Sequence, residues 1–82
     1  MKSDTESTYN DENQLRLKSI AAFLKQCRLQ SGLTQELLGE YAELNRSSVI
    51  RLESGKPVSF VTICKYASGL ELPLYQLFMD ID

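Results

Sequence analysis

The chain has 82 residues, 43% of them hydrophobic and 24% charged, which is the size and composition of one small globular domain. It contains no histidine and no tryptophan, which excludes the commonest general base, the commonest zinc ligand and every nucleophile pair that needs a histidine. The two cysteines, Cys27 and Cys64, lack the spacing of a metal site or a redox motif, and no apolar run is long enough to cross a membrane. We expect a reduced, cytoplasmic chain that is not an enzyme and takes no metal or cofactor.

The net charge of −2 hides an uneven distribution of charged residues. The first 14 residues hold one lysine and four acidic residues, and two aspartates stand among the last three residues. Residues 15–79 carry eight lysines and arginines against five glutamates, so the middle of the chain is mildly basic. An acidic total therefore does not exclude a polyanion as partner, because the charge on one face of the molecule decides this.

The first predicted helix follows a polar segment. Residues 1–14 have no aliphatic side chain after Met1 and predict a flexible tail. From residue 15 to about residue 30, apolar residues recur at helical spacing, and Arg28 lies on the same face. Gly32 provides the left-handed residue that ends this helix. The apolar positions of the helix are Leu17, Ile20, Ala21, Leu24 and Cys27.

Further helices are predicted from capping residues. Thr34 would begin a helix to about residue 42, Asn45 a helix to residue 54, and Ser59 a helix to about residue 69. Pro73 suits the start of a fifth helix. The sequence shows neither period-two alternation nor a hairpin dipeptide, so we expect an all-α fold of five helices.

The predicted packing follows from these helices. Leu37, Leu38 and Tyr41 are expected to point inward from the second helix. The predicted core consists of Ile20, Leu24, Leu38, Ala42, Leu44, Val49, Leu52, Ile63, Ala67, Leu70 and Leu77.

Residues 35–54 form the most informative segment, two short helices joined by a tight turn with Gly39 midway in the first. A glycine inside a helix costs about 1 kcal/mol relative to alanine, so its presence indicates a close approach of the two helices. The chain resembles the lambda-repressor/Cro-type helix-turn-helix family, also called the XRE family. The resemblance covers about residues 16–79 and rests on two motifs, Thr34-Gln35-Glu36-Leu37-Leu38-Gly39 and Glu53-Ser54-Gly55-Lys56.

The resemblance implies a five-helix lambda-repressor-like DNA-binding domain over residues 15–82, with the helix-turn-helix at about residues 35–54. Three features depart from the family pattern. The small residue in the second helix is Gly39, where alanine is commoner, and glycine fits there sterically. Glu43 occupies a turn position that is usually glycine, and a positive φ there would cost about 1–2 kcal/mol in strain. The turn after Gly55 is about one residue shorter than usual.

The resemblance also implies site residues. The third helix, about residues 46–54, would enter the major groove, where the forked guanidinium of an arginine can bond guanine O6 and N7. The base-reading candidates are Arg46, Ser47 and Arg51. The phosphate-contacting candidates are Gln35, Ser48, Ser54 and Lys56.

Arg28 and Glu53 have a structural role in the resemblance, as a partly buried ion pair that holds the third helix at its angle. Ile50 is open to two interpretations, contact with a thymine methyl group or packing against a neighbouring helix, and we slightly favour packing.

The predicted function is a sequence-specific DNA-binding transcriptional regulator of the Cro or repressor type, acting on double-stranded DNA as a homodimer. The alternative is a helix-turn-helix fold used mainly for contact with a protein partner, as in an antitoxin, and the acidic ends of the chain favour it more than a strongly basic chain would. The C-terminal helix has more apolar residues than one side can bury, although these could also cap the core of the monomer. The dimer candidates are Leu74, Tyr75, Phe78, Met79 and Ile81.

Overall fold

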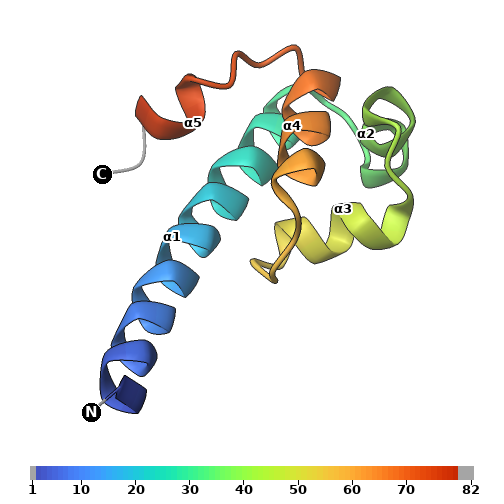
Figure 1. Ribbon diagram of the computed structural model, residues 1–82. Coiled ribbons are helices and arrows are strands. Elements are labelled where there is room, and N and C mark those ends of the chain that lie inside the picture. Colours follow the sequence, from blue (N-terminus) through green and yellow to red (C-terminus); the bar gives the residue numbers. More distant parts are fainter. Residues whose placement is uncertain (1, 80–82) are drawn as a thin grey trace.

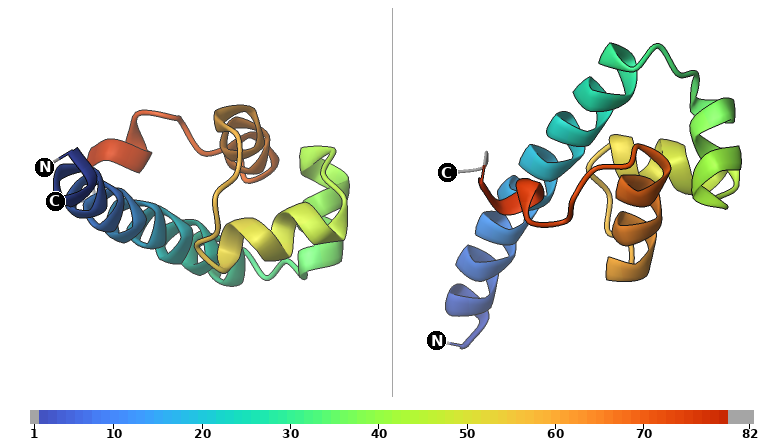
Figure 2. Two further views of the ribbon diagram at one scale, coloured as in Figure 1. Left: turned by 60° about the horizontal axis from the view of Figure 1, so that its bottom comes forward. Right: turned by 90° about the horizontal axis from the view of Figure 1, so that it is seen from above.

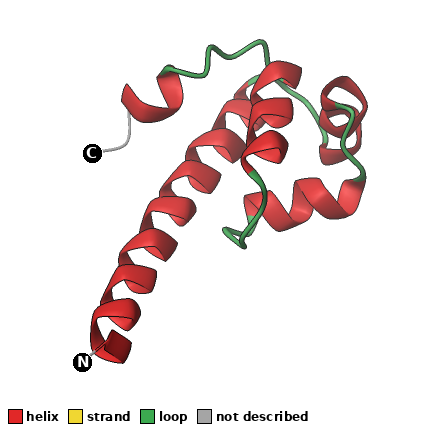
Figure 3. Ribbon diagram, in the orientation of Figure 1, coloured by secondary structure: helices red, strands yellow, loops and turns green. Residues whose placement is uncertain are grey.

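The computed structural model describes the backbone of residues 2–79 and the side chains of residues 12–77. Within these residues the regular structure is helical and no strand occurs, so the predicted all-α class is confirmed (Figure 3). The helices are α1 (Lys2–Gln30), α2 (Gln35–Ala42), α3 (Arg46–Glu53), α4 (Phe60–Gly69) and α5 (Gln76–Met79) (Figure 1). Among the described residues, four helices have eight residues or more, and the fifth, α5, is a single turn that begins three residues after Pro73.

The first helix begins at Lys2, so the helix start predicted near residue 15 is wrong. Residues 2–30 contain neither proline nor glycine, and a helix that has formed in one segment extends at little cost into the next. The N-terminal turns of α1 project beyond the other helices (Figures 1 and 2), and the longest dimension of the molecule is 46 Å. The division of the chain into a tail and a domain at residue 15 stays a prediction.

The starts of α2, α3 and α4 are confirmed at the predicted capping residues. In each case the side-chain oxygen of the cap accepts a hydrogen bond from the backbone N–H three residues later, which satisfies a group that the helix itself leaves unpaired. The bonds run from Leu37 to Thr34 at 3.0 Å, from Ser48 to Asn45 at 2.8 Å and from Thr62 to Ser59 at 3.1 Å.

The four longer helices end in the same way. A residue in the left-handed conformation follows each, and the next N–H reaches back to the carbonyl five residues earlier, which is the Schellman motif. The left-handed residues are Gly32 (φ 74°), Glu43 (φ 58°), Gly55 (φ 77°) and Glu71 (φ 56°). The structure thus confirms Gly32 as the left-handed residue that ends α1. Glu43 has the positive φ that is typical of its turn position in the family. Nothing in the sequence marks Glu71, because the glycine expected near that helix end, Gly69, is still helical.

Glu43→Gly should raise the free energy of unfolding by up to about 1 kcal/mol, because glycine has no Cβ to clash in the left-handed region. Urea unfolding measures this change. The matched control is Glu40→Gly, which places glycine inside α2 and should lower the free energy of unfolding by about 1 kcal/mol. A Glu43→Gly variant that is less stable than wild type would contradict the strained geometry.

The core lies between α1, α2, α3 and α4, and Leu77 of α5 belongs to the same buried cluster. Of the predicted core, Ile20, Leu44 and Leu70 are only partly buried, and the other members are buried. Tyr66, which is completely buried, was not among the predicted core residues. The buried hydrophobic residues are Ala21, Leu24, Leu38, Ala42, Val49, Leu52, Ile63, Tyr66, Ala67 and Leu77.

The predicted inward orientation of Leu37 and Tyr41 is wrong, because both are exposed, Tyr41 by 61%. Leu38 and Ala42 are four residues apart on one helix face and occupy the inward positions of α2. Residues 37 and 41 are rotated from that face by one helical step each, so they cannot also point inward.

α2 is packed closely on both sides. A Cβ atom at Gly39 would lie 2.7 Å from the carbonyl oxygen of Leu44 in the turn that follows α2. A Cβ atom at Gly69 of α4 would lie 2.9 Å from Cβ of Ala42. These contacts explain why a glycine stands inside each helix. None of the described helices combines the length and the apolar composition that a membrane span requires.

Candidate nucleic-acid interface

α3 turns one face to the core and the other to solvent. Val49 and Leu52 are buried, whereas Ile50 and Arg51, which lie between them in the sequence, are exposed. A shallow hollow of about 300 Å³ lies on the outer face of α3. It is lined by Ser47, Ile50, Arg51, Ser54 and Lys56. The structure therefore brings together two of the three base-reading candidates and two of the phosphate-contacting candidates.

Ile50 belongs to this outer face. Its side chain is 40% exposed and lines the hollow beside Ser47 and Arg51. This position favours contact with a ligand. It argues against packing on a neighbouring helix, the interpretation that the sequence slightly favoured.

The remaining base-reading candidate, Arg46, lines a second hollow of about 270 Å³ together with Thr34, Gln35 and Glu36. The hollow lies at the N-terminal ends of α2 and α3. Helix N-termini direct backbone N–H groups outward and carry a partial positive charge, so this surface is suited to an anion such as phosphate.

Three of the candidates already make hydrogen bonds within the protein. Nε of Arg51 donates to the carbonyl oxygen of Pro57 at 2.8 Å, which ties the outer face of α3 to the following loop. The hydroxyl of Ser54 donates to the carbonyl oxygen of Ile50 at 2.7 Å, so its single proton is not free for a phosphate. Gln35 donates from Nε2 to a carboxylate oxygen of Glu53 at 3.1 Å.

Behind the outer face lies a buried polar cluster of Arg28, Gln35, Glu53 and Tyr66. Arg28 donates from Nε to Oε2 of Glu53 at 2.6 Å and from Nη2 to Oε1 at 3.1 Å. Its third bond, from Nη1 to the carbonyl oxygen of Leu33, is 2.7 Å long. The side chains of Arg28 and Glu53 are only 7% and 3% exposed. The ion pair implied by the resemblance is therefore present, and it links α1 to the end of α3.

Tyr66 completes this cluster, and sequence reasoning missed its role. Its hydroxyl donates to Oε2 of Glu53, so the carboxylate accepts bonds from α1, α2 and α4. Tyr66 follows the buried Ile63 by three residues, a spacing typical of one helix face, and a buried tyrosine hydroxyl requires a partner. The identity of that partner is a long-range contact that no local pattern carries.

The cluster has a definite protonation state. Burial alone would raise the pKa of Glu53, but the hydrogen bonds from Arg28, Tyr66 and Gln35 outweigh it and lower the pKa below its ordinary value of 4.5. The bond to Glu53 raises the pKa of Arg28 against the effect of its own burial. Burial, and then donation to Glu53, raises the pKa of Tyr66 far above its ordinary range. At neutral pH the cluster therefore holds a carboxylate, a guanidinium and a protonated phenol.

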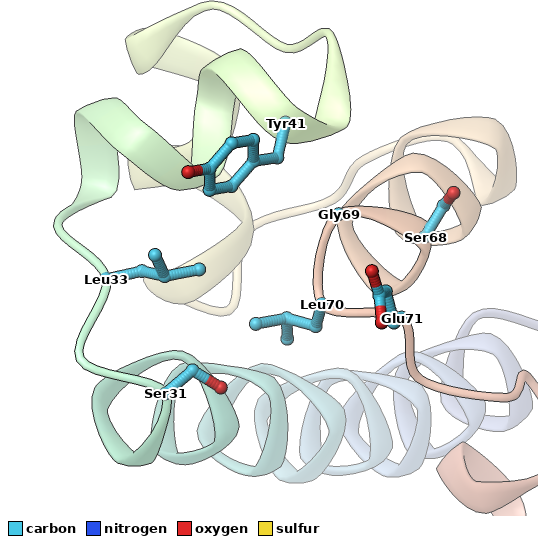
Figure 4. Close-up of a pocket in the computed structure, with 7 residues that line it drawn as sticks. All are labelled: Ser31, Leu33, Tyr41, Ser68, Gly69, Leu70 and Glu71. Atoms are coloured by element: carbon cyan, nitrogen blue, oxygen red, sulfur yellow. The ribbon is translucent and has the colours of Figure 1, made fainter.

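A further hollow, of about 380 Å³, lies between the end of α1, α2 and the end of α4 (Figure 4). Leu33 and Leu70 point toward one another across it, and Tyr41 reaches over it from α2. None of the predicted DNA-contacting residues lines it. This hollow is therefore separate from the candidate interface.

The five dimer candidates lie near the C-terminus. Leu74 packs partly buried against the core, whereas Tyr75 is 63% exposed. The side chains of Phe78 and Met79, both within α5, and the whole of Ile81 lie outside the described residues.

Comparison with known proteins identifies the family. A family model described as helix-turn-helix matches residues 24–77. The chain belongs to the lambda-repressor/Cro-type helix-turn-helix family. A search of the curated proteins finds no match for this helix-turn-helix chain.

Solved structures of restriction-modification controller proteins share this fold. The restriction-modification controller protein C.AhdI from Aeromonas hydrophila is 36% identical, with a TM-score of 0.70 over 76% of this chain and 96% of that chain. Wild-type C.Esp1396I, another restriction-modification controller protein, is 24% identical, with a TM-score of 0.73 over 80% and 88% of the two chains. A C.Esp1396I variant bound to its highest-affinity operator site matches with a TM-score of 0.74 at 24% identity, again over 80% and 88%. At this identity the C.Esp1396I structures show the likeness of the fold alone.

Proposed function

We propose that this chain is a sequence-specific DNA-binding transcriptional regulator that places α3 in the major groove. The observation that carries the proposal is the outer face of α3, where Ser47 and Arg51 line one hollow with Lys56 while the opposite face is buried in the core. The likeness to the controller protein C.AhdI and the operator complex of the C.Esp1396I variant support it. The function is binding, without chemical turnover.

In this proposal the exposed face of α3 divides its tasks between bases and phosphates. Arg46, Ser47 and Arg51 read base edges, and because Nε of Arg51 is held by Pro57, its two terminal nitrogens are the pair that faces guanine O6 and N7. Lys56 and the N-terminal ends of α2 and α3 bind phosphates and fix the register of the protein on the duplex.

The proposal includes a homodimer. One recognition helix covers few base pairs, whereas two copies related by a two-fold axis would place two α3 helices about 34–36 Å apart, one turn of DNA. The C-terminal region supplies the proposed contact, because Tyr75, one of the five dimer candidates, exposes a large aromatic side chain. In this proposal α5 corresponds to the fifth helix of a lambda-repressor-like domain.

Selection of bound duplexes from a randomised pool tests the function and the dimer together. The selected sequences should be palindromic, with half-sites one helical turn apart. Binding should weaken steeply as salt is raised, because phosphate contacts release counterions. A chain that selects no sequence, or binds without dependence on salt, would instead favour the protein-contact function.

Arg46→Ala and Arg51→Ala should each weaken binding to the selected site by about 1–3 kcal/mol, roughly 5- to 150-fold, because each loses a paired contact to a base. Both arginines are exposed, so thermal unfolding should remain close to that of wild type. The matched control is Lys65→Ala, which removes one positive charge from the exposed surface of α4 and should leave sequence preference unchanged. Wild-type affinity in both arginine variants would refute the assignment of base-reading residues.

A further inference from the structure

Gln35 is the member of the polar cluster that reaches the candidate interface. On one side its Nε2 donates a hydrogen bond to Oε1 of Glu53 at 3.1 Å. On the other side the half-buried residue lines the hollow at the N-terminal ends of α2 and α3, next to Thr34, Glu36 and Arg46. A side-chain amide has two N–H donors on one nitrogen, so a bond to Glu53 still leaves one donor.

The acceptor that holds Gln35 is itself fixed in place. Arg28 engages both oxygens of the Glu53 carboxylate, and the hydroxyl of Tyr66 engages Oε2. The side chain of Glu53 is only 3% exposed, and Tyr66 is completely buried, so packing also restricts both side chains. The position of Oε1, and with it the direction of the Gln35 amide, is therefore set by α1 and α4 rather than by α2 alone.

We propose that Glu53 and Tyr66 are positioning residues for the phosphate contact of Gln35, with the carboxylate holding one amide N–H so that the other is aimed at a DNA phosphate. This inference rests on the proposed function. It adds to the ion pair a task in DNA recognition that goes beyond holding α3 at its angle.

The charges in the cluster are compatible with a phosphate nearby. The negative charge of Glu53 is compensated by the guanidinium of Arg28 at 2.6 Å, so the carboxylate does not present a free charge to the DNA. The carboxylate of Glu36 also lines this hollow, but the positively charged Arg46 lines it as well and offsets that negative charge. Gln35 is neutral, so losing its contact should weaken binding without changing the salt dependence.

A double-mutant cycle on DNA affinity tests the proposal, with the full chain and the duplex that wild type selects. Gln35→Ala and Tyr66→Phe should each weaken binding about three- to tenfold, the value of one hydrogen bond. The double variant should be no weaker than Gln35→Ala alone, because the hydroxyl of Tyr66 acts on DNA only through Gln35. The matched control is Tyr41→Phe, which removes a hydroxyl from an exposed tyrosine on α2 and should leave affinity unchanged.

The outcomes separate the inference from the function on which it rests. Losses that multiply in the double variant, or wild-type affinity in Tyr66→Phe, overturn the positioning role while DNA binding by wild type still supports the proposed function. A wild-type chain that binds no DNA overturns both. Melting curves show whether each variant is folded at the temperature of the binding assay.

A measurement on the wild-type chain covers the case in which Tyr66→Phe does not fold. In NMR spectra of the free protein, the two side-chain amide protons of Gln35 should exchange with solvent at different rates, because one is donated to Glu53. Addition of the selected duplex should slow the exchange of the second proton. Equal rates in the free protein, or no change with DNA, overturn the proposal.

Discussion

Replacement of Glu53 by alanine should lower the free energy of unfolding by about 3–5 kcal/mol, because it leaves the Arg28 guanidinium buried without its counter-charge. Gln35 and Tyr66 lose their acceptor at the same time. Glu53→Gln should be intermediate, since the amide keeps the shape of the carboxylate and one accepting oxygen but not its charge. Urea unfolding at neutral pH measures the free energy of unfolding of wild type, Glu53→Ala and Glu53→Gln. The control Glu40→Gln, at an exposed position of α2, should be close to wild type.

The same cluster should make the stability of the wild-type chain depend on pH. The pKa of Glu53 is lower in the folded chain than its ordinary value of 4.5, so the folded chain binds this proton less readily than the unfolded chain. The contribution of Glu53 is therefore complete above pH 4.5 and is lost as the pH falls through the folded pKa. Glu53→Gln should lack this loss, and Glu40→Gln should retain it. Parallel acid dependence in wild type and Glu53→Gln would refute the assignment.

Gly39→Val should destabilise the domain by about 1–3 kcal/mol, because a Cβ atom at this position would lie 2.7 Å from a backbone oxygen of the following turn. The Leu44 carbonyl cannot move aside as a flexible side chain would, and the N–H of the same residue is bonded to the Gly39 carbonyl at 2.8 Å. Gly39→Ala should also destabilise, by less, since the clash outweighs the better helix propensity of alanine. Thermal and urea unfolding rank the two variants.

The control for this series is Glu40→Ala, one residue further along α2, where the side chain is exposed and the substitution should be close to neutral. A Gly39→Ala variant more stable than wild type would show that the turn relaxes away from α2, and the close contact would then have no structural cost.

Local chemistry made much of the fold predictable. The caps Thr34, Asn45 and Ser59 were predicted because a cap depends only on the cap residue and its next few neighbours. The ion pair between Arg28 and Glu53 came from the resemblance, since the two residues are 25 positions apart in the chain.

What the sequence did not reveal depends on distant contacts or on backbone energetics. The bonds from Gln35 and Tyr66 to Glu53 arise only when α2, α3 and α4 are assembled. The left-handed conformation of Glu71 is imposed by the helix end, although the residue type disfavours it. The early start of α1 reflects extension of an existing helix, which needs no apolar pattern.

The bond between Arg51 and Pro57 has a thermodynamic consequence for binding. An arginine that moves freely in solvent loses up to about 2 kcal/mol of rotamer entropy when a ligand immobilises it. For Arg51 part of that loss occurs when the chain folds, because the Pro57 carbonyl already restrains its guanidinium. In the proposed complex the Pro57 carbonyl would therefore lower the entropic penalty of base reading by Arg51, and the backbone path of the loop after α3 would be under the same functional constraint as the recognition helix.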